Sequence, residues 1–275
     1  MREWNHSWII SLGALAAFAV LTEGRATAQS AYQVIELTDG GTISGTVKWA
    51  GAPVKPLALP ITKNPDICDP GSKKMRDLER MLIGPDGGVE NTVIYLKNVT
   101  RGKAMDLPET RASLNQKTCR YEPHIMLVPQ GAELKMKSTD PILHNIHMAG
   151  VAVYNLPFPI KDKEIERPMR KAGVVDMKCD AGHVWMNGEV LVVQHPYYAV
   201  TDEHGNFKLS GVPPGDYEIV AWHEGWSIVR EETVMDVDSH QEVHRPIFSE
   251  PKTWEKKVSV RAGGTARVAF EISEK

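Results

Sequence analysis

The amino-acid sequence predicts an all-β protein of one large or two modest domains. Glycine and proline are frequent, at 22 and 18 of 275 residues, and they punctuate the chain as turns between short segments. Apolar and polar residues alternate within several of these segments, which is the period of a β-strand. Basic and acidic residues nearly balance, at 32 against 35, with no long run of either sign. This charge balance does not predict a nucleic-acid partner.

The start of the chain differs in texture from the rest. Arg2 precedes the apolar stretch IISLGALAAFAVL at 9–21, and the small residues of ATAQ at 26–29 follow it. This order is typical of a secretory signal peptide, so we expect residues 1–28 to be removed. The apolar stretch is shorter than the ~20 residues that cross a bilayer, and an uncleaved anchor is the alternative. The mature chain is then expected to be periplasmic or secreted, without a membrane span.

Export determines how the cysteines Cys68, Cys119 and Cys179 are interpreted. An oxidising compartment pairs thiols, and an odd number leaves one of them over. Cys179 has histidine and methionine beside it, whereas Cys68 and Cys119 lie in the proline-flanked stretches NPDICDP and KTCRYEP. Three pairings are open, and we predict a Cys68–Cys119 disulfide with Cys179 unpaired.

The first two thirds of the chain contain several predicted strands. The segment GTISGTVKW at 41–49 alternates in polarity, and a proline-rich loop follows it. A second strand is expected within 91–99, after the glycine turn at 86–88. The segment 123–140 again predicts a strand, a glycine turn and a strand. The strand at 173–179 leads into the loop KCDAGHVWM, and another strand follows at 189–194.

The sequence pattern changes after His195, where turn-forming residues become more frequent. EHGN at 203–206 and the repeat of glycine at 263–264 each predict a hairpin, and PPGD at 213–216 predicts a sharp turn. We therefore place a domain boundary near residue 196, which divides the mature chain into 29–195 and 196–275.

The loop at 178–186 contains three side chains that copper favours, Cys179, His183 and Met186. A copper ion that shuttles one electron is suited by a thiolate, two imidazoles and a weak axial thioether. His144 follows a turn signal at a strand end and is the natural second imidazole. His147 ranks lower, because three residues along an extended segment it points to the opposite side. The predicted set is one copper ion held by His144, Cys179, His183 and Met186.

The order of DPILHN, a strand ending in cysteine, and a loop with histidine and methionine resembles the cupredoxin family, of which plastocyanin is an example. The segment PHIMLVPQGAELKMKSTD resembles the strand-turn-strand that precedes the first histidine ligand in that family. The resemblance implies a Greek-key β-sandwich over roughly 82–195 with copper at one end. It also implies that Asn145, next to the first histidine, helps to tie the two ligand loops together.

The ligand loop departs from the plastocyanin spacing, since its cysteine and histidine are separated by three residues and its histidine and methionine by two. This leaves open the colour class of the copper and an added carboxylate ligand such as Glu122 or Glu189. His124 is an additional ligand or a structural hydrogen-bonding residue, and we favour the structural role. Zinc also suits cysteine and histidine, but the thioether of Met186 argues against it.

The C-terminal segment resembles the carboxypeptidase regulatory-like, or transthyretin-like, β-sandwich. The matching pattern is TD-x-x-G-x-F-x-L-x-x-V-P-P-G-x-Y, carried by Thr201, Asp202, Gly205, Phe207, Leu209, Val212, Pro213, Pro214, Gly215 and Tyr217. The resemblance implies a scaffold or contact module without a catalytic set. The strand at 41–49 also resembles the first strand of this module, so insertion of the copper domain within it is an alternative. We interpret Trp222, His223 and Glu224 as packing with a solvated pair.

The predicted function is one-electron transfer in the periplasm with a redox partner protein, reached through an exposed edge of His183, and not enzymatic catalysis. A copper carrier or reservoir is an alternative that methionines near the site, Met126, Met148 and Met177, would support. A small redox enzyme would need an open copper position. A cell-surface adhesion module would require that Cys179 form a disulfide and bind no metal.

Overall fold

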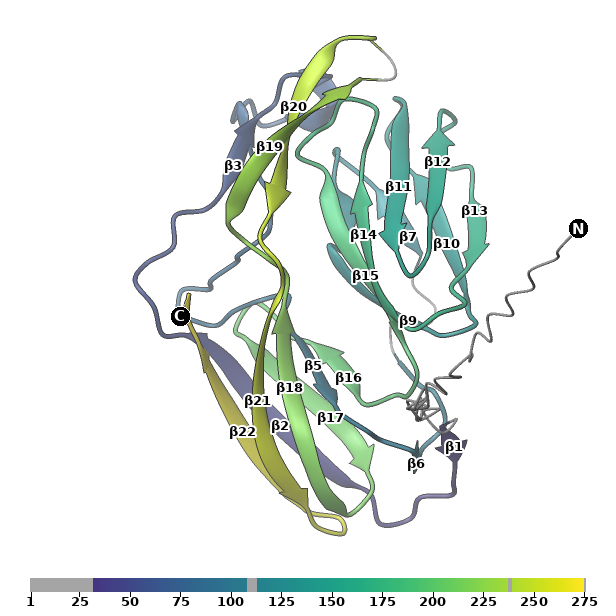
Figure 1. Cartoon of the computed structure of the whole chain (residues 1–275), viewed down its shortest axis with the longest axis vertical. Helices are drawn as coiled ribbons and strands as arrows, with labels where there is room; N and C mark the ends of the chain where they lie inside the picture. Colours follow the sequence, from purple (N-terminus) through teal and green to yellow (C-terminus); the bar gives the residue numbers. More distant parts are fainter. Residues whose placement is uncertain (1–31, 108–112, 237–238, 275) are drawn as a thin grey trace, which may run out of the picture. The chain divides into compact units, whose positions relative to one another are not determined.

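The computed structural model describes residues 32–107, 113–236 and 239–274 (Figure 1). Strands dominate these residues, which confirms the predicted all-β class. The helix α1 (Pro65–Cys68) has four residues. In this described part of the chain no helix is both long and apolar enough to cross a membrane. The predicted signal peptide at 1–28 lies outside the described residues.

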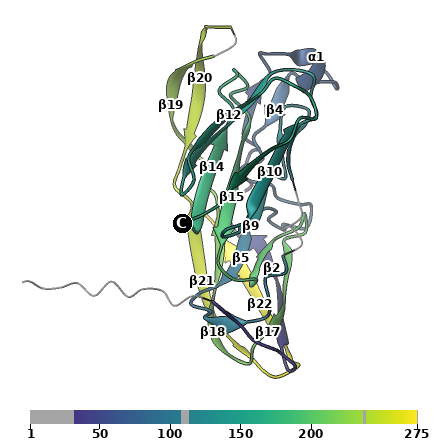
Figure 2. The same ribbon diagram turned by 90° about the vertical axis from the view of Figure 1, so that its right-hand side faces the viewer.

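The first sandwich is formed by a four-stranded and a five-stranded sheet. Its strands are β7 (Leu114–Gln116), β8 (Tyr121–Glu122), β9 (Ile125–Pro129), β10 (Glu133–Ser138), β11 (His144–Gly150), β12 (Tyr154–Phe158), β13 (Ile165–Pro168), β14 (Gly173–Lys178) and β15 (Asn187–Val193). The strand orders are β13-β10-β7-β8 and β12-β11-β14-β15-β9. The side view in Figure 2 shows β14 and β15 of the larger sheet beside β10 of the smaller one.

The second sandwich is formed by a four-stranded and a three-stranded sheet, in the orders β16-β5-β18-β21 and β17-β2-β22. Its strands are β2 (Gly41–Trp49), β5 (Val93–Leu96), β16 (Tyr198–Val200), β17 (Asn206–Val212), β18 (Gly215–His223), β21 (Lys252–Val260) and β22 (Thr265–Ile272).

Three two-stranded pairs complete the described structure. They join β1 (Gln33–Val34) with β6 (Arg101–Gly102), β3 (Ala58–Pro60) with β4 (Met75–Asp77), and β19 (Ile228–Met235) with β20 (Glu242–Phe248).

The burial of the strands follows from their sequences. Alternate residues of β10, ELKMKS, are buried, as period-2 patterning requires of a strand with one face in the core. In β15, NGEVLVV, every residue after the first is buried, because this strand is covered on both faces. The methionines Met126, Met148 and Met177 are buried in the hydrophobic core of the first sandwich.

Strand pairing corrects the sequential division of the chain at residue 196. β2 pairs along its length with β22 and β17, and β5 lies between β16 and β18. Both strands precede the first sandwich in sequence, so the division into 29–195 and 196–275 assigns them to the wrong sandwich. The first sandwich is inserted between β5 and β16, which was the alternative. The reason is that β2 buries Ile43 and Val47 in the core of the second sandwich.

Two predicted hairpins are wrong for a shared reason. The strands on either side of 203–206, β16 and β17, belong to different sheets, and so do β21 and β22 on either side of 263–264. Both turns therefore connect the two layers of the second sandwich. A tight turn fixes the reversal of the chain, but the choice between pairing and crossing to the other sheet depends on packing far away in sequence.

Candidate metal centre

The predicted ligands come together at one end of the first sandwich. Cys179 directly follows β14, and His144 begins β11, which is the antiparallel neighbour of β14. The loop after Cys179 turns back into β15 and carries His183. One nitrogen of each histidine and the sulfur of Cys179 lie within 4.8 Å of one another, and all three residues are buried. The site is thus a buried His/Cys cluster whose members the sequence had singled out.

A compact turn holds the second half of the cluster. The backbone N–H of Met186 donates to the carbonyl of His183 at 2.9 Å. The Nδ1 atom of His183 lies 3.7 Å from the sulfur of Cys179. Met186 is buried close behind them in sequence, and its place as the fourth ligand stays a prediction.

The Nε2 atom, or outer nitrogen, of each imidazole lies within hydrogen-bonding distance of an oxygen that can accept. His144 Nε2 lies 2.8 Å from Oδ2 of Asp140, and His183 Nε2 lies 3.0 Å from Oδ1 of Asn64. These oxygens accept, so each Nε2 carries the proton and each Nδ1 keeps a lone pair. No described residue hydrogen-bonds with the buried Nδ1 of His144. An unsatisfied buried lone pair on a ring of this cluster fits a metal ion, because metal-bound histidines keep the other nitrogen protonated and hydrogen-bonded.

The protonation of the cluster is set mainly by burial. Burial raises the pKa of the Cys179 thiol to about 11, against an opposing effect of backbone N–H groups, first that of Ala181 and then that of Asn145. Burial, together with His144, lowers the pKa of His183 to about 3. At neutral pH His183 is therefore uncharged and ready to donate its lone pair. A metal ion that binds here displaces the thiol proton.

His183 does not offer the exposed edge that the sequence interpretation assigned to it. Its side chain is 0% exposed, and Asn64 covers its outer nitrogen. The ion pair between Lys63 and Asp236, at 2.6 Å, also lies near enough to act on the pKa of His183. The correction arises because the segment before α1 packs over the ring, and no local pattern around His183 signals this.

Asn145 has the geometry that the resemblance implied. Its side-chain oxygen accepts the backbone N–H of Asp180 at 3.2 Å, and its amide donates to Asn155 at 2.5 Å. His147 lies away from the cluster, with its Nδ1 atom 2.6 Å from a carboxylate oxygen of Asp180.

The remaining predicted groups lie outside the cluster. His124 is buried and its Nε2 atom contacts Glu224, in line with the structural role. Glu122 is an exposed residue of β8. Glu189 is paired with Arg80 at 3.3 Å. None of the three belongs to the groups of metal-ligating atoms found among the described residues.

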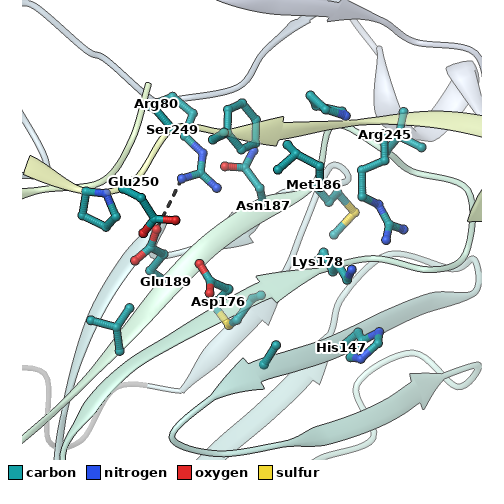
Figure 3. Close-up of a pocket in the computed structure, with 18 residues that line it drawn as sticks. Arg80, His147, Asp176, Lys178, Met186, Asn187, Glu189, Arg245, Ser249 and Glu250 are labelled. Carbon is teal, nitrogen blue, oxygen red and sulfur yellow. Dashed lines mark hydrogen bonds and ion pairs between the residues drawn. The ribbon is translucent and has the colours of Figure 1, made fainter. Parts of the chain in front are cut away.

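A cavity of about 530 Å³ adjoins Met186 (Figure 3). Its wall includes Arg80 and Glu189, joined by the dashed ion pair in the figure. Arg80 also pairs with Glu224 at 2.5 Å, and Glu224 is 0% exposed. The predicted solvated pair at 222–224 is therefore wrong: Glu224 belongs to a buried charge cluster with Arg80 and His124. A fully buried carboxylate requires such partners.

Several residues of the site were not found from the sequence. Asp140 belongs to the turn signal before His144, and no other role was inferred for it, although a carboxylate four residues before a histidine is a local signal. Asn64 and Arg245 carry no such signal. Arg245, in β20, donates to the carbonyl of Cys179 at 2.8 Å and to Asp180 at 3.0 Å.

Comparisons with known proteins divide along the same two sandwiches. A family model described as BOS complex subunit NOMO1-like, second beta sandwich domain, matches residues 193–247. No curated protein matches the chain. Among solved structures, a purple cupredoxin from Nitrosopumilus maritimus is similar at 25% identity over 26% of this chain and 81% of its own, with a TM-score of 0.24.

Two further solved structures are similar to the chain. A reduced tryptophan-to-tyrosine mutant of amicyanin matches at 24% identity over 32% of this chain and 87% of its own, with a TM-score of 0.27. A copper-containing nitrite reductase from Thermus scotoductus matches at 17% identity over 33% of this chain and 24% of its own, with a TM-score of 0.28. The first sandwich is cupredoxin-like. Its two sheets and the buried cluster after β14 and at the start of β11 carry this conclusion, and the other sandwich is a second β-sandwich domain.

Proposed function

We propose that the protein is an exported mononuclear copper protein that transfers single electrons to or from a partner protein. The observation that carries the proposal is the convergence of a thiol and two imidazoles in a buried site. Thiolate and imidazole together suit copper, and a trigonal set with a distant thioether is typical of electron-transfer sites.

The chain's own residues would divide the work in a simple way. His144, Cys179 and His183 would hold the ion, and Met186 would be the weak fourth ligand. Asn64 and Asp140 orient the rings, since they bind the nitrogens that face away from the cluster. Bound copper would supply the one-electron couple. Ligand residues that are already fixed in the metal-free protein would change their positions little between the two oxidation states of the ion. Such small rearrangement favours fast electron transfer.

The partner and the compartment follow from the same proposal. The expected signal peptide would deliver the chain to the periplasm or the exterior, where its disulfide is stable. Because His183 is buried, a partner protein would exchange electrons through the residues that cover the site and not by touching a ligand.

The decisive experiment is a Cu(II) titration of the mature chain, residues 29–275, followed by visible absorption. We expect an intense thiolate-to-copper band that saturates at one equivalent. Cys179→Ser is the matched control and should abolish the band while the fold is kept. A colourless titration of the wild-type chain would overturn the proposal.

The carrier alternative loses its support, because Met126, Met148 and Met177 are buried in the core and do not form a methionine-rich surface. The cavity beside Met186 favours a second candidate, a copper redox enzyme that admits a small molecule. Azide is a suitable probe. If azide changes the absorption of the copper-loaded wild-type protein, the enzyme is favoured, and an unchanged spectrum favours electron transfer.

A further inference from the structure

We infer that the Cys68–Cys119 disulfide is a positioning element of the metal centre, because it joins the two segments that hold the outer nitrogens of both histidines. The inference rests on the proposed copper function and adds a role for residues outside the ligand set. It is carried by three sets of contacts, made by the sulfur atoms, by Asn64 and by Asp140.

The disulfide lies directly against the cluster. Both cysteines are buried, and their sulfur atoms lie within 4.8 Å of a ring nitrogen of His183. The sulfur of Cys119 also lies within 4.8 Å of ligand atoms of Asp140 and His144. The cross-link therefore forms part of the wall that both imidazoles pack against.

One arm of the cross-link leads to His183. Cys68 ends α1 and Asn64 precedes it, and the carbonyl of Asn64 accepts the backbone N–H groups of Ile67 and Cys68. An asparagine at this position usually caps its own helix with its side chain. Within the described structure the Asn64 side chain makes no capping bond, and it reaches His183 Nε2 instead. Fixing Cys68 thus fixes the residue that holds the ring.

The other arm leads to His144. Thr118 and Cys119 both adopt left-handed backbone angles, and their N–H groups each donate to Asp140 at 2.8 Å. Asp140 in turn binds His144 Nε2. Burial opposes ionisation of Asp140, but these hydrogen bonds outweigh it and lower the pKa of the carboxyl group. Cys119 therefore hydrogen-bonds directly with Asp140, the residue that orients this ring.

The two arms are distant in sequence, since the cysteines are 51 residues apart. The α1 segment lies outside the two sheets of the cupredoxin-like sandwich, and the disulfide adds a covalent link to the packing of Ile61 and Ile67 against its core. Arg76 provides a further link, because its guanidinium group donates to the carbonyls of Cys68 and Thr118. Arg76 is partly exposed and links the segments by hydrogen bonds, whereas the disulfide links them covalently.

The test compares three forms of the mature full chain. Cys68→Ala/Cys119→Ala removes the cross-link and leaves Cys179 as the single cysteine. Asn64→Ala keeps the cross-link and removes the acceptor on His183, and the third form combines all three substitutions. Copper affinity is measured by chelator competition at the thiolate band. In the metal-free proteins, ¹⁵N chemical shifts report the tautomers of His144 and His183.

We expect the loss of the cross-link to raise the copper Kd about 10- to 100-fold, the usual range for residues that orient metal ligands. Asn64→Ala should add less in its absence than in its presence, because both changes act on the same ring. The metal-free wild type should show a single Nε2–H tautomer for each ring, and the cysteine variant an average of two.

The outcomes separate the inference from the proposed function. A folded cysteine variant with wild-type copper affinity and wild-type tautomers would overturn the inference. A wild-type chain that binds no copper, while the cysteine variant still loses its fixed tautomers, would refute the copper function and support the positioning role. If the variant does not fold, the metal-free wild type is compared before and after reduction by dithiothreitol, which gives two thiols and cyclic oxidised reductant. Unchanged tautomers after that reduction would equally overturn the inference.

Discussion

The side-chain oxygen of Asn145 accepts the backbone N–H of Asp180 at 3.2 Å, and so ties the residue after His144 to the residue after Cys179. The contact joins the start of β11 to the end of β14 at the edge of the cluster. We predict that Asn145→Ala weakens copper binding about 10-fold and destabilises the metal-free protein by about 1 kcal/mol. Chelator competition and urea unfolding measure the two effects. Asn115→Ala is the control, since it removes a side-chain hydrogen bond to Thr139 elsewhere in the same sandwich, and an equal loss of affinity in both would refute the tie.

Met186 is predicted to be the weak fourth ligand. Met186→Ala should keep a thiolate band at one equivalent of copper but shift its position, because an axial ligand tunes the site without creating the band. Met177→Leu, at another buried methionine of the same core, is the matched control and should leave the spectrum unchanged. A Met186→Ala spectrum identical to that of the wild type would exclude the thioether from the ligand set.

The buried cluster of Arg80, His124 and Glu224 should be important for stability. Glu224→Gln leaves Arg80 with Glu189 as its remaining carboxylate partner. Removing one member of a buried pair costs about 3 kcal/mol or more, so urea unfolding of the variant should begin at clearly lower denaturant. The control is Glu255→Gln, which breaks the exposed pair with Lys97 and should change the midpoint little. Equal midpoints for Glu224→Gln and the wild type would contradict the prediction.

His195 should make stability depend on pH. Burial lowers its pKa to about 4, whereas the unfolded chain has a histidine pKa of about 6.5. Between these two pKa values the unfolded state binds more protons than the folded state does. The free energy of unfolding therefore increases as the pH rises through this range and decreases on acidification. The contribution of this histidine between pH 7 and pH 5 is on the order of 2 kcal/mol.

Urea unfolding of the metal-free protein at pH 7 and pH 5 measures this effect. His195→Gln should reduce the difference between the two pH values, and His204→Gln, at an exposed histidine, should not. The prediction fails if all three proteins lose the same stability on acidification.

The inserted topology makes the C-terminal segment incomplete by itself. We predict that a fragment of residues 196–275 does not fold, because β2 forms the middle of one sheet of the second sandwich and β5 lies between two strands of the other. Circular dichroism and thermal unfolding test this against the mature full chain. A cooperative transition of the isolated fragment would contradict the prediction.

The members of the buried cluster, His144, Cys179 and His183, could be predicted because their chemistry and spacing are local. Cys179, His183 and Met186 lie within one loop, and His144 follows a strand end. The predicted Cys68–Cys119 pairing is also present in the structure. The residues that orient the rings could not be found in this way. Asn64 lies 119 positions before His183. Its side chain does not cap its own helix, and no local sequence pattern indicates that it binds His183 instead.

The fold class was equally accessible, whereas strand pairing was not. Alternation identified β2 with the bounds that the structure has, and it identified a strand in the segment that contains β10. It could not reveal that β2 pairs with β22, because period 2 records which face of a strand is buried and not which strand lies beside it. The same limit explains the two hairpins that proved to be connections between sheets.

The insertion between β5 and β16 also imposes an order on folding. β2 (Gly41–Trp49) lies in parallel beside β22 (Thr265–Ile272), so one of the first strands to be made waits for the last. The strands of the cupredoxin-like sandwich are all synthesised long before β22. This sandwich lies in the loop between β5 and β16, and the entropic cost of closing a loop grows only slowly with its length. Pairing between such distant segments is slow. An emerging chain would therefore complete its cupredoxin-like sandwich first, while β2 and β5 wait for their partner strands from β16 onward.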